Sequence, residues 1–242
     1  MRWRIAALGA LVLAVIAFAW SARPRALEFA SSFEVARGQA KREGAWIVAH
    51  VRRGDRPLGV KMDEETLAAR EIRVAGHDGF VHVRVDAEKE TELAERLAGR
   101  GAALSVVVTD ASGEVLAQLP GFASGDTLAT FLQRVRARRS KIEGSLARLA
   151  KDGGDVAARL DLAESLFALG ATERAESEVE RARRDADAPA AAEPVRALAP
   201  RALSLQADLL EARGQDGEAA RLRRELSERY PASPFAQGSR RE

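Results

Sequence analysis

The stretch that decides the fold is Ala45-Trp46-Ile47-Val48-Ala49-His50-Val51. Such a nearly continuous apolar run is typical of a strand that is buried on both faces of a sheet, as in parallel sheets covered by helices. The flanking segments fit this interpretation, because residues 33–42 are amphipathic and residues 62–72 return to a helical composition. The sequence therefore predicts a helix, a buried strand and a second helix in that order.

The alternation of helix and strand continues to residue 136. Residues 80–85 and 104–109 predict strands, and residues 88–97 predict a helix between them. Asp110-Ala111-Ser112-Gly113 has the composition of a turn. Residues 114–119 alternate and predict the second strand of a hairpin. A closing helix is predicted over residues 126–136, so this part of the chain is an α/β domain.

Three short phrases add a family likeness to this order. Residues 62–67 (MDEETL) form an acidic stretch, residues 83–86 (VRVD) end the second strand, and residues 106–113 (VVVTDASG) form the hairpin. Their order and spacing resemble those of extracytoplasmic thioredoxins. The resemblance implies a thioredoxin-like domain over residues 23–138, in which a helix begins at a redox-active dithiol.

The chain departs from that family at the positions that carry its chemistry. Thioredoxins act through a thiolate that attacks a disulfide and a second thiol that resolves the mixed disulfide, yet the sequence contains no cysteine. Counting back from Met62, the two cysteine positions fall on Arg56 and Gly59, at the ends of Arg56-Pro57-Leu58-Gly59. The usual cis-proline falls on Leu104 or a neighbour. We therefore expect a degenerate active site and no enzyme activity.

The histidines offer an alternative chemistry. His50 takes the place of the buried acid of the family's first strand, and His82 falls in the adjacent predicted strand, so a shared metal ion is conceivable. The favoured interpretation is core or sheet-face histidines, with no metal and no cofactor. The net charge is only +2, and the basic residues between Arg134 and Lys141 lack interleaved aromatics. We expect no nucleic acid partner.

The composition changes beyond residue 138. Region 139–242 is rich in Ala, Leu, Arg and Glu, and two of its segments resemble tetratricopeptide repeats, each with a helix, a turn glycine and a second helix. The implied core positions are Leu162, Ala163, Leu166, Gly170 and Ala175 in the first segment and Ala207, Leu210, Gly214 and Ala219 in the second. An Ala/Pro-rich stretch, residues 186–195, predicts a loop between them.

Two repeats are too few for a free-standing solenoid. We therefore expect this tetratricopeptide-like region to pack against the α/β domain or against another subunit. It would provide a concave docking surface for a peptide or helix, or it would be a plain pair of helical hairpins without a groove.

The first residues predict a targeting or membrane segment, assigned to residues 1–22. A short basic flank precedes apolar residues 5–20. Ala17-Phe18-Ala19 resembles the cleavage site of a signal peptide, whereas Trp3 and Trp20 fit the two interfaces of an uncleaved anchor. Both alternatives predict a location in the cell envelope: anchored in the inner membrane with a periplasmic body, or periplasmic or secreted after cleavage.

Together these features predict a non-catalytic adaptor of the bacterial cell envelope. It would bind an unidentified protein partner through the thioredoxin-like domain and the helical region, and the membrane through its N-terminal segment. The alternative is an accessory subunit of an extracytoplasmic thiol–disulfide oxidoreductase system, which would bind clients without redox cysteines of its own.

Overall fold

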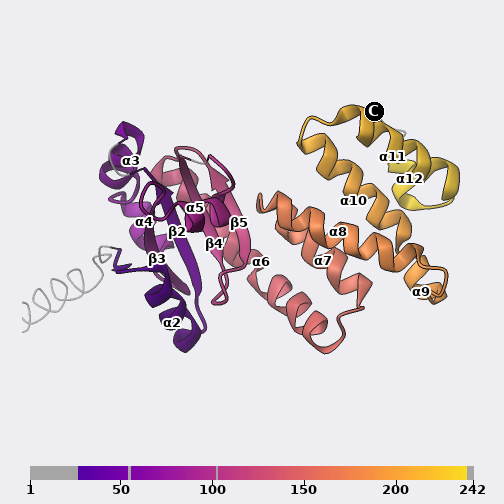
Figure 1. The fold of residues 1–242 in the computed structure, drawn as a ribbon, viewed down its shortest axis with the longest axis horizontal. Coiled ribbons are helices and arrows are strands. Elements are labelled where there is room, and N and C mark those ends of the chain that lie inside the picture. The colour runs from indigo at the N-terminus through magenta and orange to yellow at the C-terminus, as the bar shows by residue number, and fades with distance from the viewer. Residues whose placement is uncertain (1–26, 54–55, 102, 239–242) are drawn as a thin grey trace, which may run out of the picture.

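The computed structural model describes residues 27–53, 56–101 and 103–238, which form two parts joined by one long helix (Figure 1). The first part is a sheet with helices on both faces, and the second consists of helices only. No helix within these ranges is long and apolar enough to cross a membrane. The predicted signal or anchor segment, residues 1–22, lies outside the described residues.

The sheet has the strand order β1-β3-β2-β4-β5. Strand β2 (Trp46–Arg52) is central and pairs in parallel with β3 (Phe80–Asp86) and antiparallel with β4 (Leu104–Thr109). Strand β5 (Val115–Pro120) pairs antiparallel with β4, and β1 (Phe29–Ala30) pairs in parallel with β3. The sequence predicts the four longer strands but not β1, because two residues carry no periodic signal.

The two faces of the sheet bury different side chains, because successive residues of a strand point to opposite sides. Ile47 of β2 faces a core that it shares with α2 (Phe33–Glu43) and α5 (Thr91–Ala98). The neighbouring Val48 faces a second, larger core on the other side of the sheet. Burial on both faces explains the continuous apolar run that the sequence shows here.

The segment after β2 differs from the sequence-based prediction. Instead of one helix over residues 62–72, the chain forms α3 (Pro57–Lys61), a π-helical turn η1 (Met62–Thr66) and α4 (Arg70–Ala75). The backbone is extended at Ala69, where ψ is 143°, and this separates the two helical stretches. The break separates η1, which contacts α3 and α6, from α4, which packs against the closing helix, α6.

Helix α6 (Gly125–Lys151) has 27 residues and runs from the α/β part into the helical part (Figure 1). The predicted closing helix over 126–136 and the helical region predicted to start at 139 therefore share one helix. The boundary expected between 138 and 139 falls inside it. No glycine or proline interrupts residues 126–143, and buried residues extend from Leu128 to Ile142 and beyond, so nothing ends the helix earlier.

Beyond α6 the chain forms two helical hairpins. Helix α7 (Val156–Phe167) packs with α8 (Thr172–Asp187), and α10 (Ala199–Ala212) packs with α11 (Asp216–Arg229). Two short helices complete this part: α9 (Glu193–Arg196) and α12 (Pro234–Gly238). The predicted loop 186–195 is shorter than expected, because its two ends belong to α8 and α9.

Most of the expected repeat-core positions are buried. The buried ones are Leu162, Ala163, Leu166, Ala175, Ala207 and Ala219. Leu210 is only partly buried, at the side of a small core between α10, α11 and α12. Gly170 and Gly214 occupy the turns of the two hairpins, with φ of +79° and +72°. One apolar core continues from the sheet through α6, α7 and α8 into α10.

The helical part packs against the outer edge of the sheet. The backbone N–H of Gln118 in β5 donates to the carbonyl of Leu169 at 2.9 Å, and Arg174 Nη1 donates to the carbonyl of Val115 at 2.8 Å. Gly170 approaches so closely that a Cβ added there would lie 2.5 Å from the carbonyl oxygen of Gln118. Of the two expected arrangements, packing on the α/β part or on another subunit, these contacts show the first, and they cover part of β5.

Candidate functional site

The positions that the resemblance assigns to the dithiol lie at the start of α3. Arg56 is the N-cap residue and Pro57 is the first helical residue, a position that suits proline. Leu58 is exposed, whereas Gly59 is buried against the backbone. A Cβ added at Gly59 would lie 2.8 Å from the carbonyl oxygen of Arg53. A larger residue at position 59 would therefore displace the backbone.

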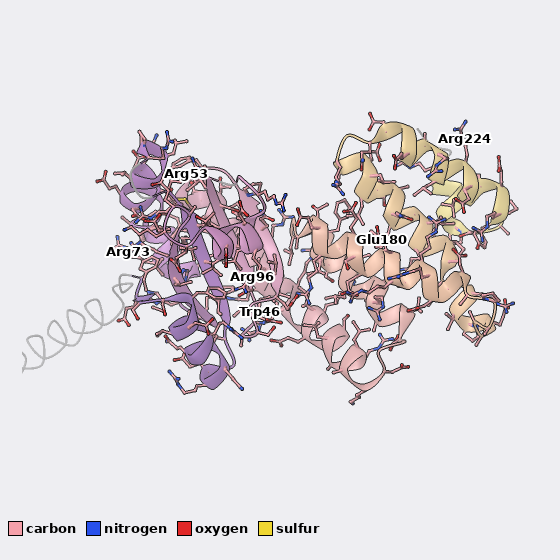
Figure 2. All side chains as sticks on the ribbon, in the orientation of Figure 1. Trp46, Arg53, Arg73, Arg96, Glu180 and Arg224 are labelled. Carbon is pink, nitrogen blue, oxygen red and sulfur yellow. The ribbon has the colours of Figure 1, made fainter. Side chains whose placement is uncertain are left out.

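Two further segments meet α3 at this end of the sheet. The N–H of Arg53 donates to the carbonyl of Ala103 at 3.2 Å, beside Leu104, the position assigned to the cis-proline. The N–H of Gly121 in turn donates to the carbonyl of Leu104 at 2.9 Å. No peptide bond within the described residues is cis. Figure 2 shows Arg53 at the α3 end of the α/β part and Trp46 towards the other end.

Large apolar side chains are exposed at this end of the sheet. Leu58 is 54% exposed, Val60 42% and Phe122 38%, and we call these three residues the apolar patch. Lys61 Nζ lies 5.3 Å from the centroid of the Phe122 ring, a cation–π arrangement that joins α3 to the segment after β5. Sequence reasoning missed Val60 and Phe122. The available signal for Phe122 was an aromatic residue directly after the Pro120-Gly121 break.

The acidic residues beside the apolar patch hold the fold together. Asp63 Oδ2 lies 3.1 Å from Arg52 Nη2, and Asp63 Oδ1 lies 3.4 Å from Arg84 Nε. One carboxylate of η1 thus pairs with cations at the ends of two parallel strands. Asp63 is therefore an ion-pair partner that links η1 to β2 and β3.

The two strand histidines form a buried hydrogen-bonded pair. His50 Nε2 and His82 Nδ1 are 2.9 Å apart, and His82 Nε2 lies 2.8 Å from the carbonyl oxygen of Gly76. A carbonyl only accepts, so His82 donates from Nε2 and accepts at Nδ1, and His50 donates from its Nε2. His50 Nδ1 is then a bare acceptor, and this buried atom has no hydrogen-bond partner. Both rings are therefore neutral.

The surroundings of the pair keep it neutral. Burial, followed by the nearby His82, Arg84 and Arg52, holds the pKa of His50 well below its usual value. Burial also lowers the pKa of His82 to about 4, against a smaller opposing effect of the hydrogen bond to Gly76. Within the described ranges, no group of three His, Cys, Asp or Glu residues is placed to hold a metal ion.

The strand order defines a thioredoxin-like fold. A parallel pair, β2 and β3, is followed by the antiparallel hairpin β4–β5 and a closing helix, which is the order that the resemblance implies. The end of the sheet where that fold carries its dithiol holds Arg56-Pro57-Leu58-Gly59 and the apolar patch. Since the sequence has no cysteine, this site supplies no thiolate for disulfide exchange.

No protein-family profile and no curated protein matches the chain. A solved structure described as a DsbH oxidoreductase is similar over 46% of this chain and 85% of its own, with 18% sequence identity and a TM-score of 0.41. At that level it carries no information about activity, and the fold assignment rests on the order and direction of the strands.

Proposed function

We propose that the protein is a non-catalytic adaptor of the bacterial cell envelope that binds a protein partner at the α3 end of its thioredoxin-like domain. The apolar patch of Leu58, Val60 and Phe122 is the observation that carries this proposal. Exposed apolar side chains that gather on one face of a domain mark contact surfaces more often than scattered ones do. Leu58 shares the face of α3 that carries Lys61, which lies over Phe122, whereas Val60 points to another side of the helix. Here the cluster takes the place of the dithiol, so binding remains where the exchange chemistry is missing.

The helical part supports a second contact. Its hairpins are tetratricopeptide-like in the packing of small residues, since Ala163, Ala175, Ala207 and Ala219 are all buried. An open concavity of about 520 Å³ lies between α8 and α10, where Figure 2 labels Glu180. Cations and anions both line it, among them Arg184 and Asp187. Such a lining suits a polar segment of the same partner better than an apolar helix.

The test is affinity capture from a bacterial envelope extract with three forms of the full-length protein. The first is the wild type. The second carries Leu58→Ser and Phe122→Ser, which shrink the apolar patch without touching the core. The third carries Val35→Ser, a matched control, because Val35 is 49% exposed on α2, at the far end of the α/β part from α3 (Figure 1).

A partner that the wild type and the Val35→Ser variant both retain, and that the patch variant loses at least tenfold, supports the adaptor. Equal capture by all three forms contradicts it. The alternative role, an accessory of a thiol–disulfide oxidoreductase system, predicts a particular subset of partners. They would carry cysteines, and mass spectrometry of the captured proteins would show an enrichment of thiol–disulfide enzymes and their clients. An adaptor without redox clients would show no such enrichment.

A further inference from the structure

The start of the described chain lies over the buried histidine pair. Strand β1 pairs Phe29 with His82 and Ala30 with Val83 of β3. The Phe29 ring packs edge-on against both imidazoles, with centroid distances of 5.6 Å to His50 and 6.0 Å to His82. We call residues 27–30 the strap.

The strap is a short segment at the edge of the sheet, and Leu27, Phe29 and Ala30 pack against its two cores. It contributes only two residues to the sheet, and Phe29 is held from outside by Arg84, whose guanidinium carbon lies 3.7 Å from the ring centroid. A cavity of about 300 Å³ runs alongside it, bordered by residues 27–30, by Gln39 and Glu43 of α2, and by His82 itself. Segments with few buried contacts open at the lowest free-energy cost. Opening the strap would expose to water the side of the pair that the Phe29 ring covers.

A third N–H group on the closed histidine pair would have no hydrogen-bond acceptor. Protonation of His82 at Nδ1 would place two N–H groups face to face, because His50 donates at that point. Protonation of His50 at Nδ1 would create a buried donor without a partner.

The charged groups around the pair add to this cost. The cationic or titratable groups packed nearby are Arg52 on β2, Arg84 on β3, Arg136 on α6 and His77 after α4. The acids are Asp63 on η1, already paired with Arg52 and Arg84, and the solvent-exposed Glu28 and Glu43 at the cavity. A positive charge on the buried pair is thus repelled by the surrounding cations. The two acids that do not pair with those cations, Glu28 and Glu43, are exposed to solvent.

We propose that the strap is an acid-sensitive cover, which leaves the edge of β3 when the His50–His82 pair takes up a proton. In the open form, water hydrates the protonated imidazole, which then faces Glu28 and Glu43. Opening also frees the outer edge of β3 at His82 and Val83, to which β1 had been paired. This inference is independent of the proposed partner binding, because the strap shares no residue with the apolar patch or with the concavity between α8 and α10.

The test is hydrogen exchange of the full-length protein in detergent between pH 7.5 and pH 5. The quantity is the exchange rate of the amides in residues 28–31 divided by the rate of the same amides in an unstructured peptide at the same pH, because this ratio cancels the intrinsic pH dependence of exchange. The amides of α7, referenced in the same way, report global unfolding. Opening that is linked to the uptake of one proton should raise this ratio by up to about tenfold for each pH unit below about 6.5.

Two variants identify the sensor. His77→Gln removes the only other histidine of the chain, which is exposed, and should leave the response unchanged. His50→Gln with His82→Gln keeps side chains that both donate and accept but cannot take up a proton at these pH values, and should flatten the ratio. A flat ratio in the wild type overturns the proposal, and so does a response that disappears in His77→Gln. If the double variant fails to fold, the wild type and His77→Gln decide the question alone.

Discussion

Replacing Gly170 by alanine tests how the two parts are joined. Gly170 sits in the turn between α7 and α8 with φ of +79°, and a Cβ there would lie 2.5 Å from the carbonyl oxygen of Gln118 in β5. Gly214 is the matched control, because it occupies the equivalent turn between α10 and α11 with φ of +72° and has nothing within 4 Å of an added Cβ.

Both substitutions place a side chain on a left-handed backbone, but only Gly170→Ala also disturbs a contact with β5. A left-handed backbone costs a non-glycine residue about 1–2 kcal/mol, and this applies at both positions. At position 170 the new methyl group must also push the turn away from β5. That movement breaks the hydrogen bond from Gln118 to Leu169, worth about 0.5–1.5 kcal/mol. We expect Gly170→Ala to lower the free energy of unfolding by about 1.5–3.5 kcal/mol and Gly214→Ala by about 1–2 kcal/mol.

Urea titrations followed by circular dichroism would measure both values under identical conditions. An equal loss in the two variants would refute the reasoning, because it would mean that the α7–α8 turn is not pressed against the sheet. Arg174→Ala gives an independent check on the same contact. It removes the bond to the carbonyl of Val115 without changing the turn, and should also destabilise the protein.

Three further predictions concern the cores and the degenerate site. Leu166→Ala should cost about 2–5 kcal/mol, because Leu166 is fully buried, and Leu210→Ala should cost clearly less in the same urea titrations, because Leu210 is only partly buried. Gly59→Cys should destabilise the protein through its contact with the backbone, whereas Arg56→Cys, at an exposed N-cap, should be near neutral; equal melting temperatures would contradict this. Stability should also fall with acid, because the pKa of His82 drops from 6.5 when unfolded to about 4 when folded. The unfolded chain then binds more protons, so the stabilisation is complete above about pH 6.5 and is lost towards pH 4, by up to about 2 kcal/mol between pH 7 and pH 5. Urea titrations at those two pH values that give the same free energy would contradict it.

The sequence predicts the α/β part well where burial leaves a strong pattern. Strand β2 is buried on both faces, so its apolar run is continuous, and the hairpin β4–β5 carries its own turn residues. For His50 and His82, the sequence predicts only that they lie in adjacent strands, not that they form a hydrogen bond. Their hydrogen bond depends on the register, in which His82 lies opposite Val48 and His50 lies opposite Arg84.

The features that the sequence does not predict depend on contacts between distant residues. The break at Ala69 follows from the different packing of η1 and α4, and nothing local to residues 62–72 indicates it. The composition changes near residue 138, and this change gives no sign that α6 is continuous. It marks the passage from the α/β part to the helical part, and both lie on one helix. Phe122 belongs to the candidate site because Lys61 of α3 lies beside it. The sequence does not predict this, since it is a tertiary contact.

Helix α6 also holds the two parts of the protein at a fixed separation. Its 27 residues correspond to a rod of about 40 Å at 1.5 Å per residue, and the covered edge of β5 keeps that rod from swinging relative to the sheet. A flexible linker would hold two weak contact sites at an effective concentration that falls as the linker lengthens. A rigid spacer removes this loss for a partner whose two binding segments match the separation of the two surfaces, and it rejects a partner whose segments are spaced differently. The selectivity of such a protein would then come from the separation of two surfaces more than from the affinity of either one.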